Sequence, residues 1–263
     1  MRKLADINLF LLDMDGTFYL GNRLLPGAPD FLAACRAKNI PFTFLTNNSS
    51  QSAQACLQKL AGMGVMVTER EMFTSGDATL LYLQQHGFAK ELLLIGTESL
   101  AAQFAEAGFV PNAARPKAVV LGFDTGITYE KLTALCNDVR AGLPYIATHP
   151  DFNCPVPGGM IPDVGAVIAF VKAATGREPD VVIGKPNAGI AEAVAARFSA
   201  PLESICMVGD RLYTDIALGE CGVRTALVLS GETRREDLAA SPFTPDYIFE
   251  DLAEMAAALS EEK

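Results

Sequence analysis

The sequence lacks the features of disulfide-rich and membrane-spanning proteins. Its six cysteines are scattered along 263 residues without a CxxC pair, which favours buried free thiols in a reducing compartment. No apolar run approaches the ~20 residues that cross a bilayer. The start MRKLADINLFLLD is interrupted by Asp6 and Asp13, so it predicts no leader sequence. These absences predict a cytoplasmic, soluble protein without a membrane partner.

Positive charge is also scarce. The chain has 21 lysines and arginines against 31 acidic residues, a formal net charge of −10. Because such a chain repels nucleic-acid backbones, we expect no nucleic-acid partner. A phosphate-bearing ligand must then be held by local groups such as a cation, a lysine or a helix N-terminus.

Repeats, low-complexity tracts and long linkers are absent, and half of the residues are hydrophobic. Short apolar runs alternate with helix-like segments along the whole chain, including a helix expected over 213–222. This alternation predicts an α/β fold in which helices cover parallel sheets.

Four polar residues follow apolar runs that read as buried strands. Asp13 follows LFLL, Thr46 follows FTFL, Lys185 follows VVIG, and Asp210 follows CMVG. Ligands of open parallel sheets bind at the carboxyl ends of the strands. The sequence therefore predicts one site built from these four strand ends.

The middle of the chain offers no comparable group, which indicates an inserted domain over the site. The prediction is a discontinuous core, residues 1–78 and 182–263, that carries the chemistry. Residues 79–181 would form the inserted domain.

The segment DMDGT, residues 13–17, predicts phosphoryl chemistry. A carboxylate such as Asp13 attacks phosphorus when the phosphoryl charge is neutralised, and Mg²⁺ is usually held by one or two carboxylates. Repulsion between neighbouring carboxylates keeps one protonated, so Asp15 is a candidate general acid. Gly16 allows a tight turn near the phosphate. The alternative is an Asp-rich turn after a strand.

Other polar residues complete the candidate site. Asp210 adds a metal carboxylate, while Asp215 either holds a metal-bound water or favours the start of a helix. Lys185 needs an anionic partner if it is buried, and is otherwise a surface residue. Thr46 and Asn47 are hydrogen-bond donors before a helix, or plain helix caps.

The segments DMDGT, TNN, GKP and GDRLYTD, in this order, resemble those of the haloacid dehalogenase (HAD) superfamily. TNNSSQS, IATHPD and VVIGKP further resemble NagD-like and 4-nitrophenylphosphatase-like enzymes, which carry an inserted C2-type cap. The resemblance implies a Rossmann-like core and, over residues 79–181, an α/β cap that selects the substrate. It implies Mg²⁺ dependence and an aspartyl-phosphate intermediate. It also implies a cap that can mediate homodimers.

The resemblance also implies roles for individual residues. Asp13 is the nucleophile, Asp15 the acid/base, and Thr46 and Lys185 bind the phosphoryl group. Asp13, the Asp15 carbonyl and Asp210 bind Mg²⁺. The expected activity is hydrolysis of small phosphorylated metabolites, namely nucleoside monophosphates or sugar and polyol phosphates, with 4-nitrophenyl phosphate as an artificial substrate. The alternatives are a phosphotransferase with the same nucleophile and a non-catalytic binding module.

The cap is expected to decide specificity through ATHPDFNCPVPGGMIPDVGA, residues 147–166, whose prolines and glycines predict an irregular loop facing the site. His149 replaces the Asn that NagD-type relatives often have before PD. It is a candidate contact for the leaving group or a surface histidine, and Asp151 and Asp163 are similar candidates. The segment FYLGNRLLPGAP after the nucleophile resembles the family's short flap.

Overall fold

The computed structural model describes residues 4–156 and 158–261. The chain divides into two compact units, of which the first comprises Met1–Thr46, Cys56–Phe73 and Lys185–Lys263, and the second Asn47–Ala55 and Thr74–Gly184. Among the described residues, no helix has the length and apolar character of a membrane span.

Unit 1 is built on a six-stranded sheet in the order β15-β14-β13-β1-β4-β5. The pairings of β1 with β13 and β4, and of β14 with β13 and β15, are parallel. The strands are β1 (Leu9–Leu12), β4 (Phe42–Thr46), β5 (Met72–Thr74), β13 (Ile205–Gly209), β14 (Arg224–Val228) and β15 (Tyr247–Phe249). Residues of β1, β4 and β13 are buried throughout, as expected of parallel strands covered on both faces.

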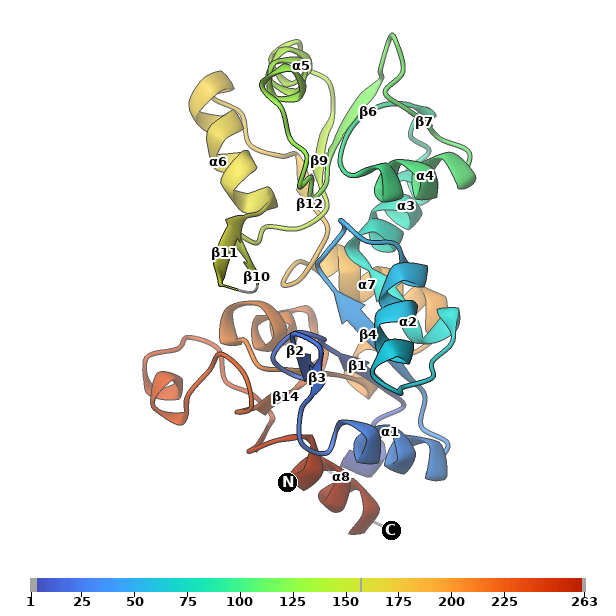
Figure 1. Ribbon diagram of the computed structural model, residues 1–263, viewed down its shortest axis with the longest axis vertical. Coiled ribbons are helices and arrows are strands. Elements are labelled where there is room, and N and C mark those ends of the chain that lie inside the picture. Colours follow the sequence, from blue (N-terminus) through green and yellow to red (C-terminus); the bar gives the residue numbers. More distant parts are fainter. Residues whose placement is uncertain (1–3, 157, 262–263) are drawn as a thin grey trace. The chain divides into compact units, whose positions relative to one another are not determined.

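The helices of unit 1 cover this sheet. They are α1 (Ala28–Ala37), α2 (Ala53–Gly62), α7 (Ala188–Phe198) and α8 (Leu252–Glu261), with short helices η1 (Leu4–Asp6), η2 (Glu69–Glu71), η3 (Leu202–Ser204), η4 (Leu212–Ile216), η5 (Ala217–Cys221) and η6 (Arg235–Ala239). Helices α1 and α8 lie side by side (Figure 1). The expected flap is a hairpin of β2 (Tyr19–Leu20) and β3 (Arg23–Leu24).

The prediction of one helix over 213–222 needs correction as to the type of helix. This stretch forms the π-helical turn η4 followed by the 3-10 helix η5. The wider turn has a local cause, because the Asp215 side chain accepts a hydrogen bond from the Arg211 N–H at 3.1 Å and holds the start of the segment.

Unit 2 contains a separate five-stranded sheet in the order β12-β9-β8-β6-β7, also with parallel pairings. Its strands are β6 (Glu91–Ile95), β7 (Val110–Pro111), β8 (Ala118–Leu121), β9 (Tyr145–Ala147) and β12 (Val181–Val182), and its helices are α3 (Ser75–Gln85), α4 (Glu98–Glu106), α5 (Tyr129–Arg140) and α6 (Val164–Thr175). The expected α/β class, with an inserted α/β cap, is confirmed.

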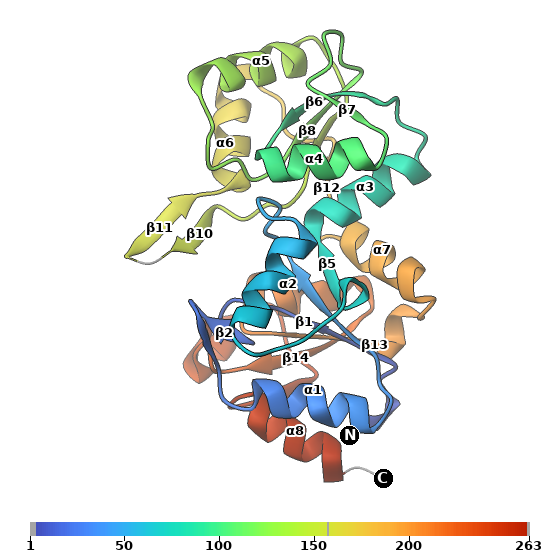
Figure 2. The ribbon, with the colours of Figure 1, turned by 45° about the vertical axis from the view of Figure 1, so that its right-hand side comes forward.

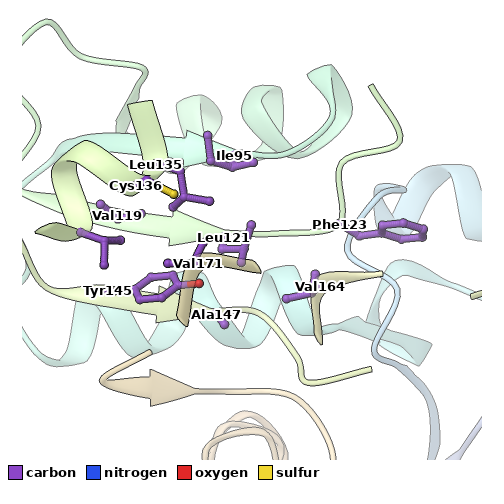
Figure 3. Close-up of a cluster of buried hydrophobic side chains, with 11 residues drawn as sticks. Ile95, Val119, Leu121, Phe123, Leu135, Cys136, Tyr145, Ala147, Val164 and Val171 are labelled. Atoms are coloured by element: carbon purple, nitrogen blue, oxygen red, sulfur yellow. The ribbon is translucent and has the colours of Figure 1, made fainter. Parts of the chain in front are cut away.

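The core of unit 2 is apolar with one exception. Val119, Leu121 and Tyr145 pack with residues of α5 and α6 (Figure 3). Tyr145 is fully buried, and its hydroxyl has no hydrogen-bond partner.

The sequence-based picture of residues 147–166 as an irregular loop is wrong in part. Residues of β10 (Asn153–Val156) and β11 (Gly159–Pro162) pair antiparallel, and the hairpin extends from α6 (Figure 2). Pro157, at its tip, lies outside the described residues. Pairing across the tip orders a segment whose proline content alone suggested no regular structure.

Candidate active site

A buried ion pair joins Asp13 to Lys185. Asp13 directly follows β1, and its carboxylate Oδ1 lies 2.6 Å from Lys185 Nζ. The same ammonium donates to Asp215 Oδ1 at 2.7 Å and to the Leu45 carbonyl at 3.2 Å. Burial alone would lower the pKa of Lys185, but Asp13 and Asp215 outweigh it and raise that pKa. Lys185 is therefore charged and is not a surface lysine.

Lys185 reaches this position by an unexpected route. The run VVIG was predicted to be a strand of the core sheet, but β12 pairs with β9 in the sheet of unit 2. Lys185 comes three residues after β12 and begins the last segment of unit 1. The prediction of four strand ends of one sheet is wrong for Lys185, because an apolar run does not specify which sheet it joins.

Asp210 and Asp215 add two buried carboxylates beside Asp13. Burial, together with repulsion from Asp13 and Asp215, raises the pKa of Asp210 to about 7. For Asp215, burial and Asp13 outweigh the opposing effect of Lys185 and raise the pKa to about 6. Both side chains retain protons more strongly than an ordinary aspartate, because negative charge is crowded in a dry site.

Two hydrogen bonds hold Asp210 in place, and the space beside it requires glycine at position 16. Thr17 Oγ1 donates to its Oδ1 at 3.1 Å, and the Glu232 N–H donates to its Oδ2 at 2.7 Å. Gly16 has a φ of +90°, and a Cβ at this position would lie 2.8 Å from the Asp210 Cγ. A side chain at Gly16 is thus excluded both by backbone conformation and by space.

The three carboxylates fit a hard cation. Ligand atoms of Asp13, Asp210 and Asp215 all lie within 4.8 Å of one another. One lysine neutralises only part of their charge, and the raised pKa values of Asp210 and Asp215 reflect the remainder. Carboxylate oxygens are the ligands that hard divalent cations take. The donor set therefore suits a metal site at the end of β1 and β13.

Asp15 has a different environment from Asp13. It is partly buried, and the Tyr19 hydroxyl donates to its Oδ2 at 3.4 Å. Burial raises the pKa of Asp15, helped by repulsion from Asp13 and opposed by the ammonium of Lys59. Lys59 also lies 3.9 Å from the centre of the Tyr19 ring. The turn thus places Asp15, a carboxyl with a raised pKa, two residues after Asp13, which is paired with Lys185.

Thr46 and Arg211 lie at the same edge of the core sheet. Thr46 is buried at the end of β4, which pairs with β1. Arg211 follows Asp210 and is held by Glu232, whose Oε2 lies 3.0 Å from its Nε. Burial would lower the pKa of Arg211, but Asp13, Asp210 and Asp215 raise it. Sequence reasoning missed Arg211, although it stands inside GDRLYTD beside a predicted ligand.

The remaining predicted residues belong to unit 2. Asn47 Nδ2 donates to Asp151 Oδ1 at 3.1 Å. His149 is fully buried and is not a surface histidine; its Nε2 lies 2.9 Å from Asp163 Oδ1. The Asp163 carboxylate also caps α6 by accepting from the Val164 N–H at 2.6 Å.

This network has further members that the sequence did not reveal. His149 Nδ1 lies 2.9 Å from Thr148 Oγ1 and 3.5 Å from Ser75 Oγ, and Ser75 donates to the Asn47 carbonyl at 2.5 Å. Ser75 and His149 are 74 residues apart, so no short sequence motif contains both. The network thus joins Asn47, the first residue of one segment of unit 2, to Ser75, near the start of the other segment.

Comparison with known proteins identifies the family of the chain. Residues 10–110 match the family of haloacid dehalogenase-like hydrolases, and residues 182–255 match a second family described as HAD-hydrolase-like. The chain is 33% identical to dihydroxyacetone phosphatase of Corynebacterium glutamicum, over 94% of this chain and 90% of that protein. It is 32% identical to the 5'-nucleotidase YutF of Bacillus subtilis, over 93% and 96%. Among solved structures, it is similar to the 4-nitrophenylphosphatase of Thermotoga maritima, with 46% identity, coverage of 97% and 98%, and a TM-score of 0.94.

Proposed function

The chain belongs to the haloacid dehalogenase-like hydrolases, in the NagD and 4-nitrophenylphosphatase group, and we propose that it hydrolyses small phosphomonoesters through an aspartyl phosphate on Asp13. The observation that carries the proposal is that two carboxyls two residues apart have different surroundings. Asp13 lies 2.6 Å from the Lys185 ammonium, while burial raises the pKa of Asp15 two residues later.

In the first half-reaction, an oxygen of the Asp13 carboxylate attacks phosphorus and the bond to the ester oxygen breaks. The Lys185 ammonium, 2.6 Å from Asp13, attracts the phosphoryl oxygens. The leaving oxygen takes a proton from Asp15, whose pKa is raised by burial. The products are an alcohol and an acyl phosphate on Asp13.

In the second half-reaction, water attacks the phosphorus of this acyl phosphate. Asp15, now ionised, accepts a proton from the water, and the bond between phosphorus and the Asp13 oxygen breaks. Inorganic phosphate leaves and both carboxyls return to their starting states. We assign Thr46 and Asn47 to hydrogen bonding of the phosphoryl group.

We propose Mg²⁺ as the cation, held by Asp13, the Asp15 carbonyl and Asp210. When bound, it neutralises phosphoryl charge and orients the ester. Thr17 and the Glu232 N–H keep the Asp210 carboxylate in a fixed direction for this task. Asp215 stabilises Lys185 and completes the cluster.

We further propose that the core, predicted at 1–78 and 182–263, performs the chemistry and that residues 79–181 select the substrate. The location of the carboxylate cluster in unit 1 and of the His149 network in unit 2 supports this division. The names of the relatives support nucleoside monophosphates and sugar or polyol phosphates as substrates. His149 would act in recognition through its contacts with Asp163 and Thr148. The six free thiols support a cytoplasmic enzyme.

The test is hydrolysis of 4-nitrophenyl phosphate with Mg²⁺, with EDTA, and by the Asp13→Asn and Asp15→Asn variants. Asp30→Asn is the matched control, because Asp30 is exposed on α1. We expect EDTA to abolish activity, Asp13→Asn to lower kcat by roughly 10³ or more, and Asp30→Asn to leave it unchanged. Intact-mass analysis of quenched Asp15→Asn enzyme should show a phosphorylated protein.

Two outcomes would contradict the proposal. Activity retained by Asp13→Asn would exclude an aspartyl phosphate at this position. More 4-nitrophenol than phosphate, with phosphorylated acceptor alcohols in the mixture, would identify a transferase instead. If both tests agree with the proposal, a panel of nucleotides and sugar phosphates identifies the substrate class.

A further inference from the structure

A second cavity lies in unit 1 at the opposite end of the strands that carry the carboxylates. It has a volume of about 550 Å³, within the range of small-ligand sites. Leu9 at the start of β1 and Phe42 at the start of β4 line it, whereas Asp13 and Thr46 stand at the other ends of these strands. At about 3.3 Å per residue, the cavity begins about 13 Å from Asp13 along β1. It is therefore separate from the carboxylate cluster.

The charge of this cavity contrasts with the rest of the chain. Arg36, Arg70 and Glu71 are its charged lining residues, so it carries a net positive charge in a chain of net charge −10. The Glu71 carboxylate is engaged by Thr68, whose backbone N–H and hydroxyl donate to Oε2 at 2.7 and 3.0 Å. Its Oε1 also lies 3.7 Å from Arg36 Nη2, so Glu71 and Arg36 form an ion pair. The net positive charge of the lining therefore resides on Arg70.

The arginines around the cavity have different tasks. Arg36 donates to the Met66 carbonyl at 3.1 Å, and Arg197 donates to the Glu69 carbonyl at 3.0 Å, so both stabilise the chain around η2. Arg70 is exposed and, within the described part of the chain, donates no hydrogen bond to a protein group. Its guanidinium lies 5.9 Å from the centroid of the Phe198 ring. Five N–H donors at the rim of the cavity remain for a ligand.

The apolar part of the lining suits a flat ring. Phe198 contributes a half-buried aromatic ring, and Ile40 and Pro41 contribute aliphatic carbon, whereas the Phe42 ring is buried beneath Arg36. The guanidinium of Arg36 lies over Phe42, 5.4 Å from the centroid. Guanidinium planes and aromatic faces stack with planar ligands, and a guanidinium fork binds carboxylate, sulfonate or phosphate oxygens.

From these observations we infer that this cavity binds a small organic anion that carries an aromatic ring, with Arg70 holding the anionic group. The ligand binds at the amino ends of β1 and β4 and does not contact the carboxylate cluster. The inference does not depend on the proposed phosphatase chemistry.

The test uses naphthalene-1-sulfonate, which is not a phosphate ester and cannot be hydrolysed as one. Because the chain has no tryptophan, the naphthalene emission is read against little protein background. We expect one site with a Kd of about 1 mM or tighter, as is typical for a ligand of this size. Arg70→Gln should weaken binding at least fivefold, since it removes the charge without removing a contact that the fold uses.

Two further variants separate the cavity from general surface binding. Arg234→Gln is the matched control, because Arg234 is also exposed and belongs to the same unit; it should change the Kd less than twofold. Ala200→Phe narrows the cavity without changing its charge or adding a tryptophan, and should weaken binding at least fivefold. Thermal melting of each variant checks that it is folded.

Three results would overturn the inference. The first is wild-type affinity in both Arg70→Gln and Ala200→Phe. The second is equal affinity for the uncharged naphthalene-1-sulfonamide, which would mean that no anion is recognised. The third is at least fivefold weaker binding by Asp13→Asn, which would place the probe among the carboxylates around Asp13.

Discussion

Replacing Lys185 by methionine tests the reading of the carboxylate cluster most directly. The ammonium donates to Asp13 at 2.6 Å and to Asp215 at 2.7 Å, and Lys185 is 3% exposed. Methionine keeps most of the volume of the side chain and removes its charge. The variant leaves buried carboxylates without their cation.

The size of the effect follows from the distances. Ligand atoms of the three carboxylates lie within 4.8 Å of one another, so each ionised pair repels by about 3 kcal/mol at an effective dielectric constant near 20. Removal of one partner from a buried ion pair typically costs about 3–5 kcal/mol of stability. For a chain of this size, that loss lowers Tm by about 10 °C.

The assay is thermal unfolding in EDTA at pH 7.5, with Lys172→Met as the matched control. Lys172 lies 2.7 Å from Glu178, the same distance as Lys185 from Asp215, but these side chains are 59% and 62% exposed. Because exposed pairs contribute about 0–1 kcal/mol, the control should melt within about 2 °C of wild type. The kcat of Lys185→Met should also fall by roughly 10²–10³, as when a group that stabilises transition-state charge is removed.

Adding Asp215→Asn to Lys185→Met removes one of the unpaired charges. The double variant should therefore be more stable than Lys185→Met alone, although Asp215→Asn alone destabilises the wild type. Two results would show that the charge of Lys185 does not stabilise the cluster. One is a Tm of Lys185→Met equal to that of Lys172→Met, and the other is a lower Tm in the double variant than in Lys185→Met.

Other predictions concern protons, space and an unpaired hydroxyl. Because the folded-state pKa values of Asp210 and Asp215, about 7 and about 6, lie above the ordinary 3.8, metal-free protein binds protons more tightly when folded and should lose stability as pH rises from about 4 to about 7. The check is Tm measured in EDTA as a function of pH, and a Tm of the wild type that does not change with pH refutes the prediction. Asp210→Asn should make Tm less dependent on pH. The rise in Tm on adding Mg²⁺ should grow with pH. Gly16→Ala should abolish metal-dependent activity by displacing Asp210, whereas Gly21→Ala, with a φ of +63° but open space around it, should cost only about 1 kcal/mol of strain. Tyr145→Phe removes a buried hydroxyl without a partner, so urea unfolding should show unchanged or slightly higher stability; a loss above about 1 kcal/mol would reveal a hidden partner.

Much of unit 1 could be predicted from sequence because buried parallel strands read as continuous apolar runs. LFLL before Asp13 and CMVG before Asp210 are such runs, and the structure pairs their strands in register from Leu9 with Ile205 onward. Where two adjacent strands both end in a carboxylate, proximity follows from geometry. The short motifs therefore identified the cluster and the family together.

The rest of the site depends on contacts between residues distant in sequence. Nothing local distinguishes VVIG from a core strand, because its sheet is decided by pairing with β9. The support of Asp210 comes from a backbone N–H at Glu232, and any residue except proline supplies that group. Ser75 meets the His149 network across 74 positions, and a lone serine carries no pattern.

The junction between Gly184 and Lys185 limits how the inserted segment can be exchanged. A Cβ at Gly184 would lie 2.6 Å from the His149 Cβ and 2.7 Å from Asn47 Oδ1, so this residue fits unit 2 without room for a side chain. Its neighbour Lys185 lies 2.6 Å from Asp13, the proposed nucleophile. One inserted residue would displace the ammonium by about 3.8 Å, more than the length of the hydrogen bond it makes. Natural or engineered recombination between relatives can therefore replace the interior of the insertion. The condition is that Gly184 stays directly followed by Lys185, with no residue added or removed at this junction.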